Sequence, residues 1–169
     1  MIAAHQHVVL VGLMGSGKST VARVLAERTG RPILDSDAVS EARTGRTVRE
    51  IFAADGEAAF RALETEVLTD ALAATEPSII AAAGGVVLSA DNRRALKSST
   101  AKVIWLCADP STLVERVTSG DHRPLLADDP AGTLQRMFDT RAALYREVAD
   151  AIVLVDNRTV QDVADAVLR

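Results

Sequence analysis

Several features that mark particular classes of protein are scarce in this sequence of 169 residues. A single cysteine and three histidines provide neither an internal disulfide nor a spaced set of zinc ligands. Aromatic residues make up only 3% of the chain, which argues against a surface that stacks nucleic-acid bases. The 19 basic residues are scattered among 23 acidic ones, so no basic patch for a phosphate backbone is expected. We therefore expect no nucleic-acid partner.

Long apolar runs are absent as well. No apolar stretch is long enough to cross a bilayer, and the first ten residues lead into an apolar segment without a charged and apolar leader. These absences predict a cytoplasmic protein with no membrane partner. The length fits one domain over 1–169, and the 48% apolar content and net charge of −4 are typical of a globular protein. Trp105 and Cys107 lie in an apolar run, and we expect both in the core.

What the sequence does contain is a complete phosphate-binding motif. The run GLMGSGKS over 12–19 matches G-x-x-x-x-G-K-[ST] at every fixed position. An apolar segment expected as a strand over 7–11 precedes it, and an amphipathic segment expected as a helix over 18–28 follows it. A motif in this context predicts that the protein binds a nucleoside triphosphate.

The residue types in this loop have separate physical roles. Glycine lets the backbone turn successive N–H groups toward phosphate oxygens, and the start of the following helix favours negative charge. Lys18 brings a positive charge to the β and γ phosphates, and the Ser19 hydroxyl is a suitable ligand for Mg²⁺. The predicted nucleotide-binding residues of the loop are Gly12, Met14, Gly15, Ser16, Gly17, Lys18, Ser19 and Thr20.

Strands and helices are expected to alternate along the whole chain. The expected strands cover 7–11, 33–35, 78–82, 102–107 and 151–155, and the later helices begin near 38, 47, 55, 89, 109, 131 and 159. Apolar strands joined by helices predict an α/β fold, with a five-stranded parallel sheet covered by helices on both faces. The polar segment 118–130 has no periodicity and predicts an exposed, mobile loop.

Two carboxylates, Asp35 and Asp37, follow the second expected strand. Because side chains alternate along an extended chain, both would point the same way, one toward a metal ion and one toward the group that accepts the phosphate. A helix cap is the alternative for carboxylates at a strand end.

These features together resemble the shikimate kinase family. The resemblance covers nearly the whole chain and rests on the phosphate loop, Asp35-x-Asp37, Asp55-Gly56-Glu57, Phe60-Arg61-x-x-Glu64, Gly84-Gly85, Arg123-Pro124-Leu125-Leu126 and Arg141-x-x-x-Tyr145. It implies a three-layer P-loop kinase fold with a lid at about 118–130. It also implies ATP-dependent phosphorylation of the 3-hydroxyl of shikimate, with Mg²⁺ as cofactor, small molecules as partners and a monomeric protein.

The resemblance implies roles for individual residues. Asp37 would bind ring hydroxyls and orient or deprotonate the attacking one, while Arg61 and Arg141 would hold the carboxylate of the substrate. Gly84 and Gly85 would also contact the substrate. Asp35 and Ser19 would serve Mg²⁺. The catalytic set would be Lys18, Asp37 and Arg123, and Arg116, Arg123 and Arg158 would contact the nucleotide.

One position departs from the family. Where shikimate kinases have three consecutive glycines, this sequence has Ala83-Gly84-Gly85. A methyl group facing the ligand would crowd it, so a kinase of the same fold for another hydroxy acid such as gluconate stays open. A relative that binds ATP without transferring phosphate is a second, separate alternative.

Overall fold

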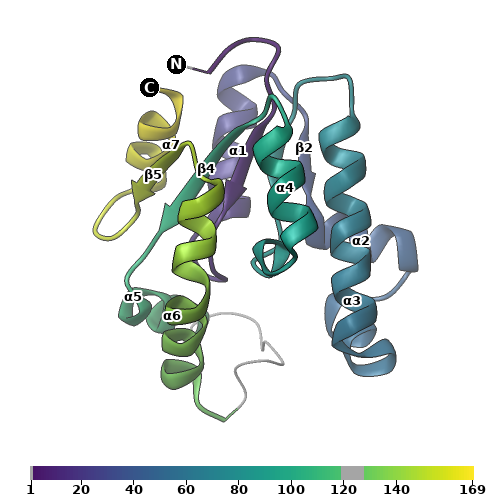
Figure 1. Cartoon of the computed structure of the whole chain (residues 1–169). Coiled ribbons are helices and arrows are strands. Elements are labelled where there is room, and N and C mark those ends of the chain that lie inside the picture. The colour runs from purple at the N-terminus through teal and green to yellow at the C-terminus, as the bar shows by residue number, and fades with distance from the viewer. Residues whose placement is uncertain (1, 119–127) are drawn as a thin grey trace.

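The computed structural model describes residues 2–118 and 128–169. The described chain forms one five-stranded sheet in the order β2-β3-β1-β4-β5, with every strand pair parallel (Figure 1). The strands are β1 (Val8–Val11), β2 (Ile33–Asp35), β3 (Ile79–Ala81), β4 (Lys102–Cys107) and β5 (Ala151–Leu154). The strand β1 lies at the centre, where Val9 is paired with Ile80 on one side and Val103 on the other.

Helices cover both faces of the sheet, as predicted (Figure 1). They are α1 (Lys18–Thr29), α2 (Ser36–Thr44), α3 (Val48–Ala73), α4 (Ala90–Ser98), α5 (Pro110–Thr118), α6 (Pro130–Val148) and α7 (Val160–Leu168), with a short 3₁₀ helix, η1 (Val86–Leu88), that was not predicted. On one face α1 packs against α7, and on the other α4 packs against α3 and α6. None of the helices in the described ranges is long and apolar enough to cross a membrane.

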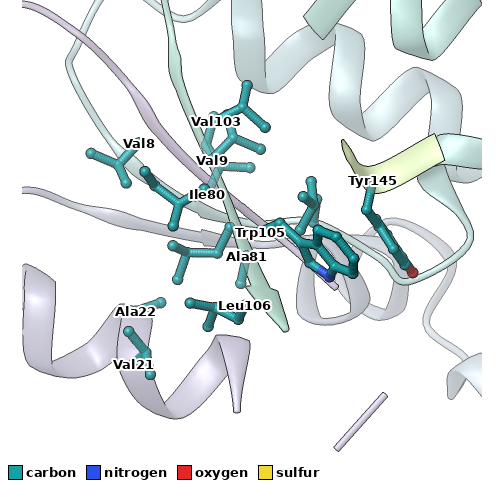
Figure 2. Close-up of a cluster of buried hydrophobic side chains, with 14 of the residues drawn as sticks. Val8, Val9, Val21, Ala22, Ile80, Ala81, Val103, Trp105, Leu106 and Tyr145 are labelled. Atoms are coloured by element: carbon teal, nitrogen blue, oxygen red, sulfur yellow. The ribbon is translucent and has the colours of Figure 1, made fainter. Parts of the chain in front are cut away.

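The core forms where the central strands meet the helices. Side chains of β1, β3 and β4 lie against Val21 and Ala22 of α1 (Figure 2). Trp105 is buried as predicted, and its ring stacks on Tyr145 of α6 with 5.6 Å between ring centroids. The prediction for Cys107 is only half right: it is partly buried, because it ends β4 beside the edge strand β5.

Several element boundaries differ from the predictions. The helix α2 begins at Ser36 rather than near 38, because the Asp35 carboxylate caps it by accepting from the N–H groups of Asp37 and Ala38. The helices expected from 47 and 55 form one element, α3, that is interrupted at Gly56 with φ 82° and ψ 174°. This conformation favours glycine. The predicted capping box between Thr47 and Glu50 is present at the start of α3.

The strand expected over 7–11 begins one residue later. His7 has a different role, because its ring joins the N–H group of Ser78 to the carbonyl oxygen of Ala74. The strands expected over 78–82 and 151–155 are likewise shorter than predicted at their ends.

Candidate functional site

A cavity of about 570 Å³ opens beyond the carboxyl ends of the strands. Ligands of open parallel sheets bind at this edge, where the loops after the central strands converge. Most of the predicted site residues line the cavity: Met14, Gly15, Ser16, Gly17, Lys18, Ser19, Thr20, Asp35, Asp37, Arg61, Gly84, Gly85, Arg116, Arg141 and Arg158. Arg123 and most of the expected lid lie outside the described residues.

Gly12 is not among the residues that line the cavity, and its contact with the nucleotide stays a prediction. The residue shapes the phosphate loop. Its φ is 146°, and a Cβ atom there would lie 2.5 Å from the carbonyl oxygen of Leu106. The loop can therefore leave β1 close against β4 only with glycine at this position. Gly15 and Gly17 also have positive φ, and Gly17 precedes the first turn of α1 without adding a side chain. The amino end of α1 thus presents its N–H groups to the cavity, a suitable arrangement for phosphate.

Lys18 and Ser19 begin α1 and line the cavity. The Lys18 ammonium donates to the carbonyl oxygens of Gly12 at 2.8 Å and Leu13 at 3.1 Å. The Ser19 hydroxyl donates a short hydrogen bond to the carboxylate of Asp35. A hydroxyl beside a carboxylate is an oxygen donor set that suits Mg²⁺ together with phosphate oxygens.

The two carboxylates after β2 do not lie as the alternation of an extended chain predicted. The chain becomes helical at Ser36, so Asp35 is the N-cap of α2 and Asp37 lies in its first turn. Both nevertheless line the cavity. Asp35 makes both contacts at once. Its Oδ1 atom accepts from the N–H groups of Asp37 and Ala38, and its Oδ2 atom accepts from the Ser19 hydroxyl.

Arg61 enters the cavity from α3 and is held by acidic neighbours. It donates to Glu64 at 2.8 Å and to Glu57 at 3.2 Å, and its guanidinium lies 5.6 Å from the centre of the Phe60 ring. Among the described residues, its buried Nε has no hydrogen-bond partner. The guanidinium is therefore fixed in place with one buried donor unsatisfied.

The Arg61–Glu64 pair is the main electrostatic feature of this side of the cavity. Burial raises the pKa of the Glu64 carboxyl, and the hydrogen bond and charge of Arg61 act against that shift. Burial lowers the pKa of Arg61, but the contacts with Glu64 and Glu57 outweigh it and raise the pKa above the ordinary value. Glu64 is 4% exposed, whereas the Arg61 side chain is partly exposed, so the carboxylate is the desolvated member of the pair.

Gly85 makes room for this arginine. A Cβ atom at Gly85 would overlap the Arg61 guanidinium, so no other residue fits there unless Arg61 moves. Ala83, by contrast, is accommodated in the cavity wall and is 8% exposed.

Arg141 enters the cavity from α6 and is 8% exposed. One turn later, the Tyr145 hydroxyl donates to the carbonyl oxygen of Gly84 at 2.6 Å. Asp37, Arg61 and Arg141 line the cavity, and all three act on the pKa of Glu64, so they gather in one part of it. This arrangement suits a small hydroxy acid.

The other end of the cavity has arginines beside apolar side chains. Arg116 donates to the carbonyl oxygens of Gly15 and Val155, and Arg158 follows Asn157, whose φ is 54°. The apolar side chains of this end are Val155, Val160 and Val163. Such a surface suits a nucleobase.

Sequence reasoning assigned no site role to several residues of the wall. Glu64 supports Arg61, and its spacing of three residues along a helix was the signal that could have identified it. The apolar wall of Val48, Phe52 and Phe60 also lines the cavity. Its residues come from both parts of α3, on either side of the break at Gly56.

Comparisons with known proteins agree with this geometry. The sequence profile of a family described as shikimate kinase matches residues 14–169. A shikimate kinase of Symbiobacterium thermophilum is 48% identical over 165 residues, which cover 96% of this chain and 94% of the relative. One of Burkholderia lata is 42% identical over 165 residues, covering 97% of this chain and 89% of that protein.

Solved structures give the same result. The shikimate kinase from Acinetobacter baumannii in complex with shikimate superposes with a TM-score of 0.91 at 36% identity, covering 96% of this chain and 90% of that one. A gluconokinase from Sinorhizobium meliloti has a TM-score of 0.69 at 22% identity, covering 99% of this chain and 91% of that one. The latter likeness shows a shared fold alone.

Proposed function

The chain belongs to the shikimate kinase family of small-molecule kinases, and we propose that it transfers the γ-phosphoryl group of ATP to the 3-hydroxyl of shikimate and releases ADP. The observation that carries this proposal is one continuous cavity that is lined both by the phosphate loop and by Asp37, Arg61 and Arg141. Transfer between two bound small molecules requires both binding sites in one cavity.

On the nucleotide side, the backbone N–H groups at the start of α1 would hold the phosphates. Lys18 would leave the carbonyl oxygens of Gly12 and Leu13 and contact the β and γ phosphates. Arg116 and Arg158 would flank the base. Arg123 lies outside the described residues, and its contact with the transferring phosphoryl group stays a prediction.

Mg²⁺ is the cofactor that we propose with ATP. The Ser19 hydroxyl and the Asp35 carboxylate fit the ion, because both are oxygen donors and they already lie in contact. When bound, the ion would neutralise charge that develops on the phosphate oxygens. Asp35 would keep its cap on α2, since that uses its other oxygen.

On the acceptor side, Arg61 and Arg141 would hold the carboxylate of shikimate. A guanidinium pairs with a carboxylate through two parallel hydrogen bonds, and Arg61 is oriented for this by Glu64 and Glu57. Gly84 and Gly85 would let the substrate lie close to the backbone. Asp37 would bind the ring hydroxyls and orient or deprotonate the attacking one.

We further propose that the protein is a monomer and that it is cytoplasmic. Size-exclusion chromatography with light scattering tests the monomeric state, and fractionation of cells tests the compartment.

The test of the function is ADP release from Mg-ATP, measured with shikimate, gluconate and quinate in parallel. A large rise with shikimate alone would support the proposal and make Ala83 a tolerated variation. A rise with gluconate would keep the chemistry but overturn the substrate. Nucleotide binding without stimulation by any of the acids would favour a relative that does not transfer phosphate.

A further inference from the structure

Tyr145 is a buried residue to which the proposed reaction assigns no role. It is the only tyrosine of the chain, is 1% exposed and does not line the cavity. Its hydroxyl nevertheless donates a hydrogen bond of 2.6 Å to the carbonyl oxygen of Gly84, which does line the cavity. This contact joins α6 to the turn that follows β3.

The position and the protonation of this donor are both fixed. The ring stacks on Trp105 of β4, with 28° between the ring planes. Figure 2 shows the two side chains next to each other. Burial raises the pKa of the Tyr145 phenol far above its ordinary value, against the charge and hydrogen bond of Arg141. The hydroxyl therefore remains a donor at any pH at which the protein functions.

The peptide that accepts this bond has little else to orient it. Gly84 and Gly85 lack side chains, and consecutive glycines allow many backbone conformations. Among the described residues, the carbonyl oxygen of Gly84 has no other donor. In a trans peptide the carbonyl and the next N–H group point in opposite directions. By holding the Gly84 carbonyl, the Tyr145 hydroxyl therefore turns the Gly85 N–H group away from the tyrosine.

The glycine pair lies between the two halves of the site. A Cβ atom at Gly84 would lie 3.4 Å from the carbonyl oxygen of Gly12, and one at Gly85 would overlap Arg61. The phosphate loop has hydrogen bonds of its own, from Lys18 to Gly12 and from Ser16 to Leu13. Loss of the tyrosine hydroxyl should therefore disturb the acceptor side far more than the nucleotide side.

We propose that Tyr145 is a positioning residue for the acceptor. Its hydroxyl fixes the Gly84–Gly85 peptide, and thereby the wall against which Arg61 and the bound acid lie. This inference rests on the proposed function, because the acid that it positions is the acceptor of that reaction.

The variant Tyr145→Phe tests the proposal, since it keeps the ring and its stacking and removes the hydroxyl, with its hydrogen bond to Gly84 and its contact with Arg141. We expect the KM for shikimate to rise about five- to tenfold, the size of one lost hydrogen bond, while the KM for ATP changes less than about twofold. Val148→Ala is the matched control. It removes a buried side chain, 5% exposed, from the same helix, and it should lower thermal stability without changing the ratio of the two KM values.

Two outcomes would overturn the proposal: a less stable Tyr145→Phe enzyme with an unchanged KM ratio, or an equal rise of both KM values. A wild-type enzyme without shikimate-dependent turnover would instead refute the proposed function. If Tyr145→Phe does not fold, 3-fluorotyrosine labels this position alone, because the chain has no other tyrosine. Its ¹⁹F resonance should shift when shikimate binds, and a resonance that does not move would contradict the role.

Discussion

Individual side chains in this site stabilise the fold and also contribute groups suited to binding a ligand. Asp35 caps α2 with one oxygen and contacts Ser19 with the other. Glu64 is buried at 4% exposure and is stabilised there by Arg61. Such pairing is what makes a buried charge tolerable, and removing one partner leaves the other uncompensated. Arg61, which we propose binds the substrate, is thus held by Glu64, to which the proposal assigns no ligand.

Asp37 carries the sharpest prediction at the residue scale. Asp37→Asn keeps the size of the side chain but removes the charge and the proton acceptor, so kcat should fall by about a hundredfold or more. Affinity for Mg-ADP, measured by calorimetry, should change less than about twofold, since the role that we propose for Asp37 is toward the acceptor. Near-normal turnover would remove Asp37 from the acceptor role.

Gly85 gives a prediction based on space. Gly85→Ala would place a methyl group on the Arg61 guanidinium, so the arginine must move and the KM for shikimate should rise by about tenfold or more. Ala83→Gly is the control, because Ala83 is already accommodated in the cavity wall. The KM of this variant for shikimate should stay within about twofold of the wild-type value. Equal effects of the two variants would show that the Gly85 contact does not matter.

At the scale of elements, α3 contributes Val48, Phe52, Phe60 and Arg61 to the wall of the cavity. The Thr47 hydroxyl accepts from the N–H group of Glu50, and the Glu50 carboxylate accepts from the N–H group of Thr47. Thr47→Ala should lower the free energy of unfolding by about 1 kcal/mol, the usual cost of a lost N-cap. Urea denaturation measures this. An unchanged midpoint would mean that the packing of Val48 and Phe52 alone holds the first turn.

The same capping box predicts a dependence on pH. The hydrogen bonds from Thr47 hold the pKa of Glu50 below its ordinary value of 4.5. The folded state therefore binds this proton less readily, and the stabilisation is present above pH 4.5 and lost as the pH falls through the folded pKa. The difference in thermal midpoint between wild type and Glu50→Gln should be constant above about pH 5 and narrow as the pH falls below 4.5. A constant difference would contradict the role of the charge.

At the scale of the whole molecule, the ligands should stabilise the fold because the cavity joins most of its elements. Mg-ADP at about 100 times its Kd should add about 2.7 kcal/mol to the free energy of unfolding. Calorimetric melting with and without Mg²⁺ measures this gain. Lys18→Ala should lose most of it. Equal stabilisation of that variant would place the nucleotide away from the phosphate loop.

The sequence by itself determined the features that depend on neighbouring residues. The phosphate loop, the five strands with their connecting helices, and the capping box at Thr47 each follow from local spacing or periodicity. The start of α2 escaped this reasoning, because Ser36 and Asp37 can continue a strand or begin a helix. The Asp35 cap decides between them in the folded chain.

Only the tertiary structure decided which distant residues support one another. The strand order places β1 between β3 and β4, although neither of these strands follows it directly in the chain. This arrangement brings the phosphate loop beside Gly84 and Arg61 beside Gly85. Tyr145 and Gly84 are 61 positions apart, and no local pattern encodes their contact. Residue spacing predicts contacts only between residues within a few turns of a helix or along one strand. The geometry of the cavity depends instead on how the sheet and its helices pack.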